Sequence, residues 1–170
     1  MPNLAKLPLK TDDGLVRVVI ETPMGSRQKI DYDARRRCFF VKRRMPLGVA
    51  YPFHFGFLPS THGEDGDPLD AIVLHDQSAF PGLVLNCRII GALKLSQTEE
   101  GKTVRNDRFM AVPQTEVAPD APKRIGDVSK RMRAEIEEFL RVSVRLANKE
   151  LEFEGWVDHD AAMRAIKKGG

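Results

Sequence analysis

The chain has few of the residues that mark special structural classes. It has only two cysteines, Cys38 and Cys87, which lie far apart and lack the spacing of a metal-binding or redox motif. A disulfide-stapled scaffold is therefore excluded. Because each cysteine lies in an apolar, strand-like run, we expect both to be buried free thiols.

Long apolar runs are also absent. No segment approaches the roughly 20 apolar residues that a membrane-spanning helix requires. The first six residues, Met1-Pro2-Asn3-Leu4-Ala5-Lys6, lack the apolar core of a secretory signal. We therefore expect a cytoplasmic protein with no membrane partner.

A strong excess of charge of one sign is missing as well. The formal net charge of +3 is too small to imply a nucleic-acid partner, and 30% charged residues is ordinary for a globular protein. A chain of 170 residues is long enough to bury a core without disulfides or metal staples. We therefore expect a single domain over residues 1–170.

The positive charge is nevertheless unevenly distributed. Residues 35–44 contain six cations around a short apolar run: Arg35, Arg36, Arg37, Lys42, Arg43 and Arg44. This basic cluster has two interpretations, a solvated hairpin or an electropositive wall for phosphates or nucleic acid. On charge alone, the solvated hairpin is the more common outcome.

The most informative motif is the acidic segment Glu64-Asp65-Gly66-Asp67-Pro68-Leu69-Asp70, which precedes an apolar stretch. Carboxylates so close together repel one another, and the turn that Gly66 and Pro68 form does not require them. Hard oxygen ligands on a tight loop suit Mg²⁺ or Mn²⁺, which often also bind substrate phosphates. The alternative is an ordinary acidic surface turn. The basic cluster upstream favours a site for metal and phosphate.

The hydrophobic pattern predicts a strand-rich first two thirds and a helical last third. β-branched and alternating residues predict strands at 15–21, 29–33, 38–43, 69–75, 83–95 and 104–112, whose regular spacing suggests a barrel or sandwich. From residue 127, helical spacing predicts a long amphipathic helix with Asp127 or Ser129 as its N-cap. A short helix over about 159–168, capped by Asp158, should follow.

Several further motifs have the order and spacing of one known family. Together with the acidic segment they are Val18-Val19-Ile20-Glu21, Lys29, Phe40-Val41-Lys42-Arg43, Tyr51-Pro52 with Gly56, Ala111-Val112-Pro113 and Glu154-Gly155-Trp156. The chain resembles the soluble family I inorganic pyrophosphatases over most of its length. The resemblance implies an α+β fold, with an OB-like five-stranded β-barrel flanked by C-terminal helices. It also implies a protein, often a homo-oligomer, that hydrolyses pyrophosphate to two phosphates with Mg²⁺.

The same resemblance assigns roles to individual residues. Asp67 would orient or deprotonate a metal-bound water, and Asp65 and Asp70 would bind metal. Glu21 and Asp31 would hold a further metal or its waters, although the family normally has glutamate where Asp31 stands.

Cationic and hydroxyl groups would bind the substrate. Lys29 and Arg43 would hold phosphate oxygens, which cationic side chains bind strongly. Tyr51 is either a hydroxyl near the pocket or a packing residue with a polar tip.

The chain departs from the family before Ala111-Val112-Pro113, where two more metal-binding aspartates and a phosphate-binding lysine are usual. The nearest counterparts are residues 97–100, starting at Gln97, followed by Asn106 and Arg108. Asn106 offers a metal a carbonyl oxygen without charge, and Arg108 keeps a positive charge for phosphate. Asp107 should point to the opposite face if this stretch is a regular strand.

Further departures remove polar groups. Phe55 replaces a tyrosine of the family, and a Tyr-Lys pair becomes Ser143 and Val144. Arg141 and Arg145, one helical turn apart, are candidates to replace the lost phosphate contacts.

Three hypotheses follow. The first is a Mg²⁺-dependent pyrophosphatase whose activity these departures reduce. The second is the same fold without activity, or with another phosphorylated ligand. The third is a barrel that binds nucleic acid through residues 35–44. Phe39 and Phe40 are the only aromatic residues inside this cluster, and alternation sends them to opposite faces, which disfavours the third.

Overall fold

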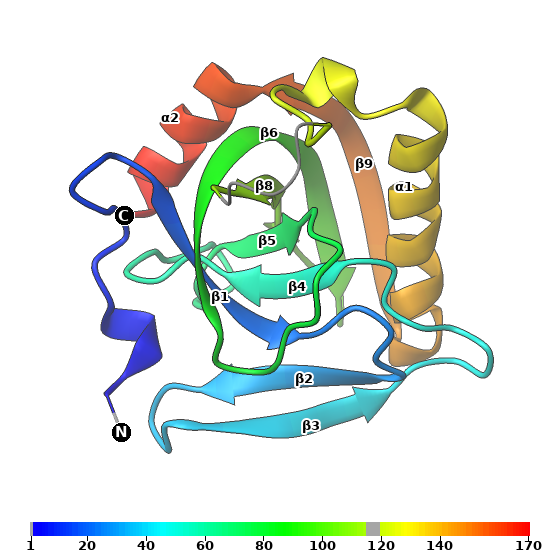
Figure 1. The fold of residues 1–170 in the computed structure, drawn as a ribbon. Helices are drawn as coiled ribbons and strands as arrows, with labels where there is room; N and C mark the ends of the chain where they lie inside the picture. Colours follow the sequence, from blue (N-terminus) through cyan, green and yellow to red (C-terminus); the bar gives the residue numbers. More distant parts are fainter. Residues whose placement is uncertain (1, 115–119) are drawn as a thin grey trace.

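Five strands form a closed ring in the computed structural model, which describes residues 2–114 and 120–170 (Figure 1). Around the ring the order is β1, β4, β5, β8 and β6, and β6 pairs with β1 to close it. The pairs are antiparallel except β5 with β8. The five strands are β1 (Val16–Thr22), β4 (His54–Phe57), β5 (Asp70–Val73), β6 (Val84–Glu99) and β8 (Arg108–Pro113). The predicted five-stranded, OB-like barrel is confirmed.

The described residues form four further strands outside this ring. The long strand β6 shifts register between Ile89 and Gly91 and continues beyond the ring. There it pairs with β7 (Lys102–Arg105) and with β9 (Lys149–Asp158). A separate two-stranded sheet of β2 (Gln28–Asp33) and β3 (Cys38–Arg44) lies at the bottom of Figure 1.

Two α-helices flank the barrel, as predicted. Helix α1 (Lys130–Val144) runs alongside β9, and α2 (His159–Gly169) follows β9 directly (Figure 1). Ser129 is the N-cap of α1, and Asp158 caps α2 by accepting from the Ala161 N–H. Three short 3-10 helices complete the described chain: η1 (Leu4–Lys6), η2 (Ile125–Asp127) and η3 (Arg145–Ala147). Neither α-helix is long and apolar enough to cross a membrane.

The helices cover two apolar clusters. Alternate residues of a strand face opposite sides, so Ala71 and Val73 belong to one cluster and Ile72 to the other. The first cluster includes Ala162 and Ile166 of α2, whereas the second includes Ile136 and Leu140 of α1. Each helix therefore packs against one of the two apolar clusters.

Four details differ from the sequence predictions. Strands β4 and β9 were not predicted. The expected strand at 104–112 is divided at Asn106 and Asp107, because the Asp107 side chain itself accepts a hydrogen bond from the Leu95 N–H at 3.1 Å. Cys87 is buried as expected, but Cys38 is exposed, because β3 belongs to the outer two-stranded sheet.

Candidate active site

One cavity of about 900 Å³ gathers all ten side chains that the sequence singled out. They come from the ends of β1, β5 and β8, from β2 and β3, from the loops after β3 and β4, and from the link between β7 (Lys102–Arg105) and β8. The ten are Glu21, Lys29, Asp31, Arg43, Tyr51, Asp65, Asp67, Asp70, Asn106 and Arg108. Positions between 21 and 108 therefore meet at one end of the barrel.

The loop between β4 and β5 forms the acidic wall of the cavity. Gly66 has a positive φ of 87°, which permits the tight turn, and the Asp65 carboxylate accepts the Asp67 N–H at 3.1 Å. Burial raises the pKa of Asp65, and the charges of Asp70 and Asp67 raise it further. The repulsion expected between these carboxylates is therefore present in the folded chain.

Glu21, near the end of β1, is a second buried acidic group. Its Oε1 accepts the Tyr32 N–H at 2.8 Å. Burial raises the pKa of Glu21 to about 8, with the charges of Asp31 and Asp70 adding to the effect. The hydrogen bond from Tyr32 stabilises the anion in part, and a cation beside the carboxylate would stabilise it further.

The opposite wall, built by β2 and β3, is cationic. The Lys29 Nζ lies 3.3 Å from Asp31 Oδ1, and the Lys42 Nζ lies 2.6 Å from Asp31 Oδ2. Burial acts to raise the pKa of Asp31, but the two ammonium groups together hold it below its usual value. Lys42 lines the cavity although the sequence analysis assigned it no role in the site.

Arg43 is anchored on one side. Its Nη2 donates to the Ser143 carbonyl at 3.0 Å, which joins β3 to the end of α1. Its Nε is buried and has no hydrogen-bond partner within the described residues. Arg43 also lines the cavity, so its guanidinium lies beside the space in which an anion would bind.

Tyr51 combines the two interpretations given above. Its ring lies edge-on to Phe55 and Phe139, with centroids 4.9 Å and 5.0 Å away, so it packs in an aromatic cluster. The residue also lines the cavity, and burial raises the pKa of its hydroxyl. The hydroxyl is therefore a neutral group at neutral pH.

The residues that depart from the family pattern also line this cavity. Arg108 Nη1 lies 2.7 Å from Asp70 Oδ2 and donates to the Asn106 side-chain oxygen at 2.6 Å. Asn106 in turn donates to Gln97 Oε1 at 3.3 Å. The guanidinium thus lies between the neutral amide and the Asp70 carboxylate. Phe55, Ser143 and Val144 complete this part of the lining.

Arg141 does not replace the lost phosphate contacts. Its guanidinium lies 4.6 Å from the centre of the Phe153 ring and 3.3 Å from Glu138, and the residue is not part of the cavity lining. Arg145 is exposed outside the lining too. Asp107 is buried, accepts the Leu95 N–H, pairs with Arg105 and is not part of the cavity lining. The prediction of its direction assumed a regular strand, and the strand is interrupted at this position.

The donor set fits a hard, hydrated cation. Carboxylate oxygens dominate the acidic wall, and their mutual repulsion is relieved by a divalent ion. Among the described residues, however, no three acidic, histidine or cysteine side chains are close enough to enclose a metal ion directly. Mg²⁺ suits such an open arrangement because it keeps several of its waters.

Comparison with known proteins agrees with this geometry. A family model described as inorganic pyrophosphatase matches residues 18–169. The inorganic pyrophosphatase of Synechocystis is 35% identical over 98% of this chain and 96% of its own length. The crystal structure of the Thermus thermophilus inorganic pyrophosphatase superposes with a TM-score of 0.88 at 32% identity, covering 98% of this chain and 95% of that one. The chain therefore belongs to the soluble, family I inorganic pyrophosphatases.

Proposed function

We propose that this protein hydrolyses inorganic pyrophosphate to two phosphates, with Mg²⁺ as its cofactor. The observation that supports this most strongly is the cavity itself. It brings the acidic segment together with the cations of β2, β3 and β8, although these elements lie far apart in the sequence. No observation favours the nucleic-acid or the altered-ligand hypothesis.

The cationic side chains would bind the substrate. Pyrophosphate carries several negative charges. These charges repel an attacking anion until the phosphoryl oxygens of pyrophosphate are neutralised. Lys29, Arg43 and Arg108 all line the cavity and are placed to do this. Tyr51 would pack beside the substrate and offer a neutral hydroxyl.

The acidic side chains would bind the metal and accept the proton of the attacking water. Asp65, Asp70, Glu21 and Asn106 would hold Mg²⁺, which would neutralise phosphoryl oxygens and increase the acidity of a nearby water. Asp67 would accept the proton of the attacking water. The new bond joins the water oxygen to one phosphorus, and the bridging oxygen leaves with the other phosphate.

The neutral amides at Asn106 and Gln97 should weaken metal loading, because each replaces a carboxylate that would offset repulsion between cations. We therefore expect lower activity than in a site with carboxylates at both positions. We also expect that Mn²⁺ can replace Mg²⁺. We also infer that residues 1–170 act as one domain. A homo-oligomeric assembly and a cytoplasmic location stay predictions.

The test is phosphate release from pyrophosphate in Mg²⁺, in Mn²⁺ and in EDTA, with tripolyphosphate as a second substrate. We expect metal-dependent release from pyrophosphate and none in EDTA. Release from tripolyphosphate alone would support the altered-substrate hypothesis. No release from either substrate in either metal would contradict the proposed function.

A further inference from the structure

A β-bulge changes the direction of the side chains on β3. Lys29 of β2 lies opposite Arg43, and the next residue, Ile30, lies opposite Val41, so Lys42 is an extra residue without a partner position on β2. In a regular strand Lys42 and Arg43 would point to opposite faces. The bulge reorients the strand locally, and both side chains line the same cavity.

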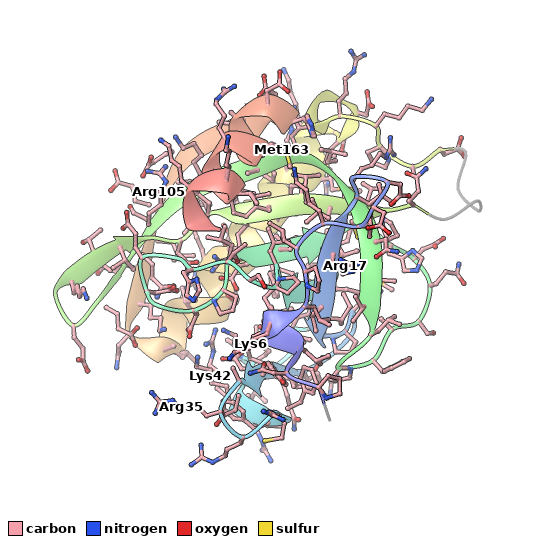
Figure 2. All side chains as sticks on the ribbon, turned by 90° about the vertical axis from the view of Figure 1, so that its left-hand side faces the viewer. Lys6, Arg17, Arg35, Lys42, Arg105 and Met163 are labelled. Carbon is pink, nitrogen blue, oxygen red and sulfur yellow. The ribbon has the colours of Figure 1, made fainter. Side chains whose placement is uncertain are left out.

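Lys42 is held in place by the Asp31 carboxylate. Its Nζ is 2.6 Å from Asp31 Oδ2, and its side chain is only 41% exposed. Burial opposes the charge, but the hydrogen bond to Asp31 and the charge of Asp67 raise the pKa of Lys42. Figure 2 shows Lys42 on the same side of the molecule as Lys6 and Arg35, which also line the cavity.

Asp31 has cations on both of its oxygens. The Lys42 Nζ lies 2.6 Å from Oδ2, and the Lys29 Nζ lies 3.3 Å from Oδ1. A carboxylate between two ammonium groups fixes both long side chains, whose free rotation would otherwise oppose substrate binding. The two ammonium groups already offset the negative charge of Asp31, which disfavours the binding of a metal cation beside it.

We propose that Lys42 is a further substrate-binding residue that contacts a phosphate oxygen, and that Asp31 positions Lys42 and Lys29 for this purpose instead of binding metal. This inference rests on the proposed function for the identity of the substrate class. It revises the metal role that the family resemblance suggested for Asp31. It also implies that the cationic wall binds a diphosphate without any metal.

The first experiment measures metal-free binding of imidodiphosphate, whose bridging nitrogen resists hydrolysis, by calorimetry in EDTA. We expect the wild type to bind, Lys42→Met to bind at least about tenfold more weakly, and Lys42→Arg to recover most of the loss, since a charge-assisted contact is restored. Lys102→Met removes the same charge from an exposed site outside the cavity and should change binding little. Circular dichroism and thermal unfolding check that each variant folds.

The Asp31→Asn variant distinguishes a role of Asp31 in positioning the lysines from simple repulsion of the anionic ligand. Removing a negative charge near a polyanion should tighten metal-free binding if Asp31 merely repels the ligand. If Asp31 positions the lysines, the substitution should weaken binding instead. In a double-mutant cycle, Asp31→Asn should then cost much less in the Lys42→Met background than in the wild type.

Three results would overturn the proposal: no metal-free binding by the wild type, equal binding by Lys42→Met, or tighter binding by Asp31→Asn. None of these results depends on turnover. Failure of this proposal is therefore distinguishable from failure of the proposed function, which is measured by phosphate release in metal.

Discussion

Asn106 determines how much negative charge faces the start of β8. Its side-chain oxygen accepts from Arg108, which also pairs with Asp70 at 2.7 Å, so a single carboxylate balances this guanidinium beside the neutral amide. Asn106→Asp adds a carboxylate on the cavity wall. We expect it to lower the Mg²⁺ concentration needed for half-maximal phosphate release, because added negative charge favours cation binding.

The matched control is Asn86→Asp, an identical change at an exposed position of β6 outside the cavity. The comparison is a Mg²⁺ titration of phosphate release by the wild type and both variants. An unchanged or higher Mg²⁺ requirement in Asn106→Asp alone would show that this position does not contribute to the metal site.

The two cysteines should react very differently. Cys87 is buried, and burial raises its thiol pKa to about 12, so almost none is present as the reactive thiolate. Cys38 is exposed. A thiol reagent at neutral pH should label one cysteine rapidly in the folded protein and two after denaturation, and Cys38→Ser should abolish the rapid phase. Rapid labelling of Cys87 in the folded protein would contradict the packing described for β6.

The sequence predicted the acidic wall better than the cationic one. Asp65, Asp67 and Asp70 belong to a compact motif whose charge repulsion is visible without a structure. Lys42 received no individual role in the sequence analysis. Regular alternation would send it away from Arg43, and only the bulge in β3 brings the two side chains together. A β-bulge of one residue produces no simple pattern in the amino-acid sequence.

Among the elements, β1 and β4 approach each other unusually closely at Gly56. This glycine lies opposite Ile20 on β1 and opposite Ala71 on β5, and a Cβ added there would overlap the Val19 carbonyl oxygen. Backbone atoms cannot move aside as a side chain can. We expect Gly56→Ala to lower the free energy of unfolding by about 3 kcal/mol or more.

Gly126 provides the control. It has open space around its Cβ position and no positive φ, so Gly126→Ala should stay within about 1 kcal/mol of the wild type. Urea unfolding, followed by the fluorescence of Trp156, the single tryptophan, gives both values. Equal stability of the two variants would argue against the close pairing of β1 with β4.

The elements differ in how clearly the sequence predicts them. Strand β4 has four residues, includes Gly56 and follows Pro52 closely, so its pattern is too short to recognise. Strand β9 does carry a recognisable pattern, since Leu151 and Phe153 alternate with exposed glutamates, and a search for alternation would have found it. The interruption of the predicted strand near Asn106 depends on the hydrogen bond that the Leu95 N–H of β6 donates to the Asp107 side chain. Hydrophobic periodicity does not reveal such a bond.

At the scale of the whole molecule, the ring of strands explains why a dispersed set of residues forms one site. Closing β6 against β1 brings the end of β1, the acidic loop before β5 and the start of β8 to the same cavity. The end of α1 reaches it through the contact between Arg43 and Ser143. Strand spacing left a barrel and a sandwich open, and both the choice of a five-stranded barrel and this convergence at one end rested on the family resemblance.

The most direct test compares the wild type with Asp67→Asn for phosphate release from pyrophosphate in Mg²⁺, alongside calorimetric binding of imidodiphosphate in the same buffer. Asparagine keeps the shape of the side chain but accepts a proton poorly. We predict that Asp67→Asn loses about 10²-fold or more in turnover while it still binds the analogue. Turnover by Asp67→Asn at the wild-type rate, or no Mg²⁺-dependent release by the wild type, would contradict the assignment of this cavity as the site of pyrophosphate hydrolysis.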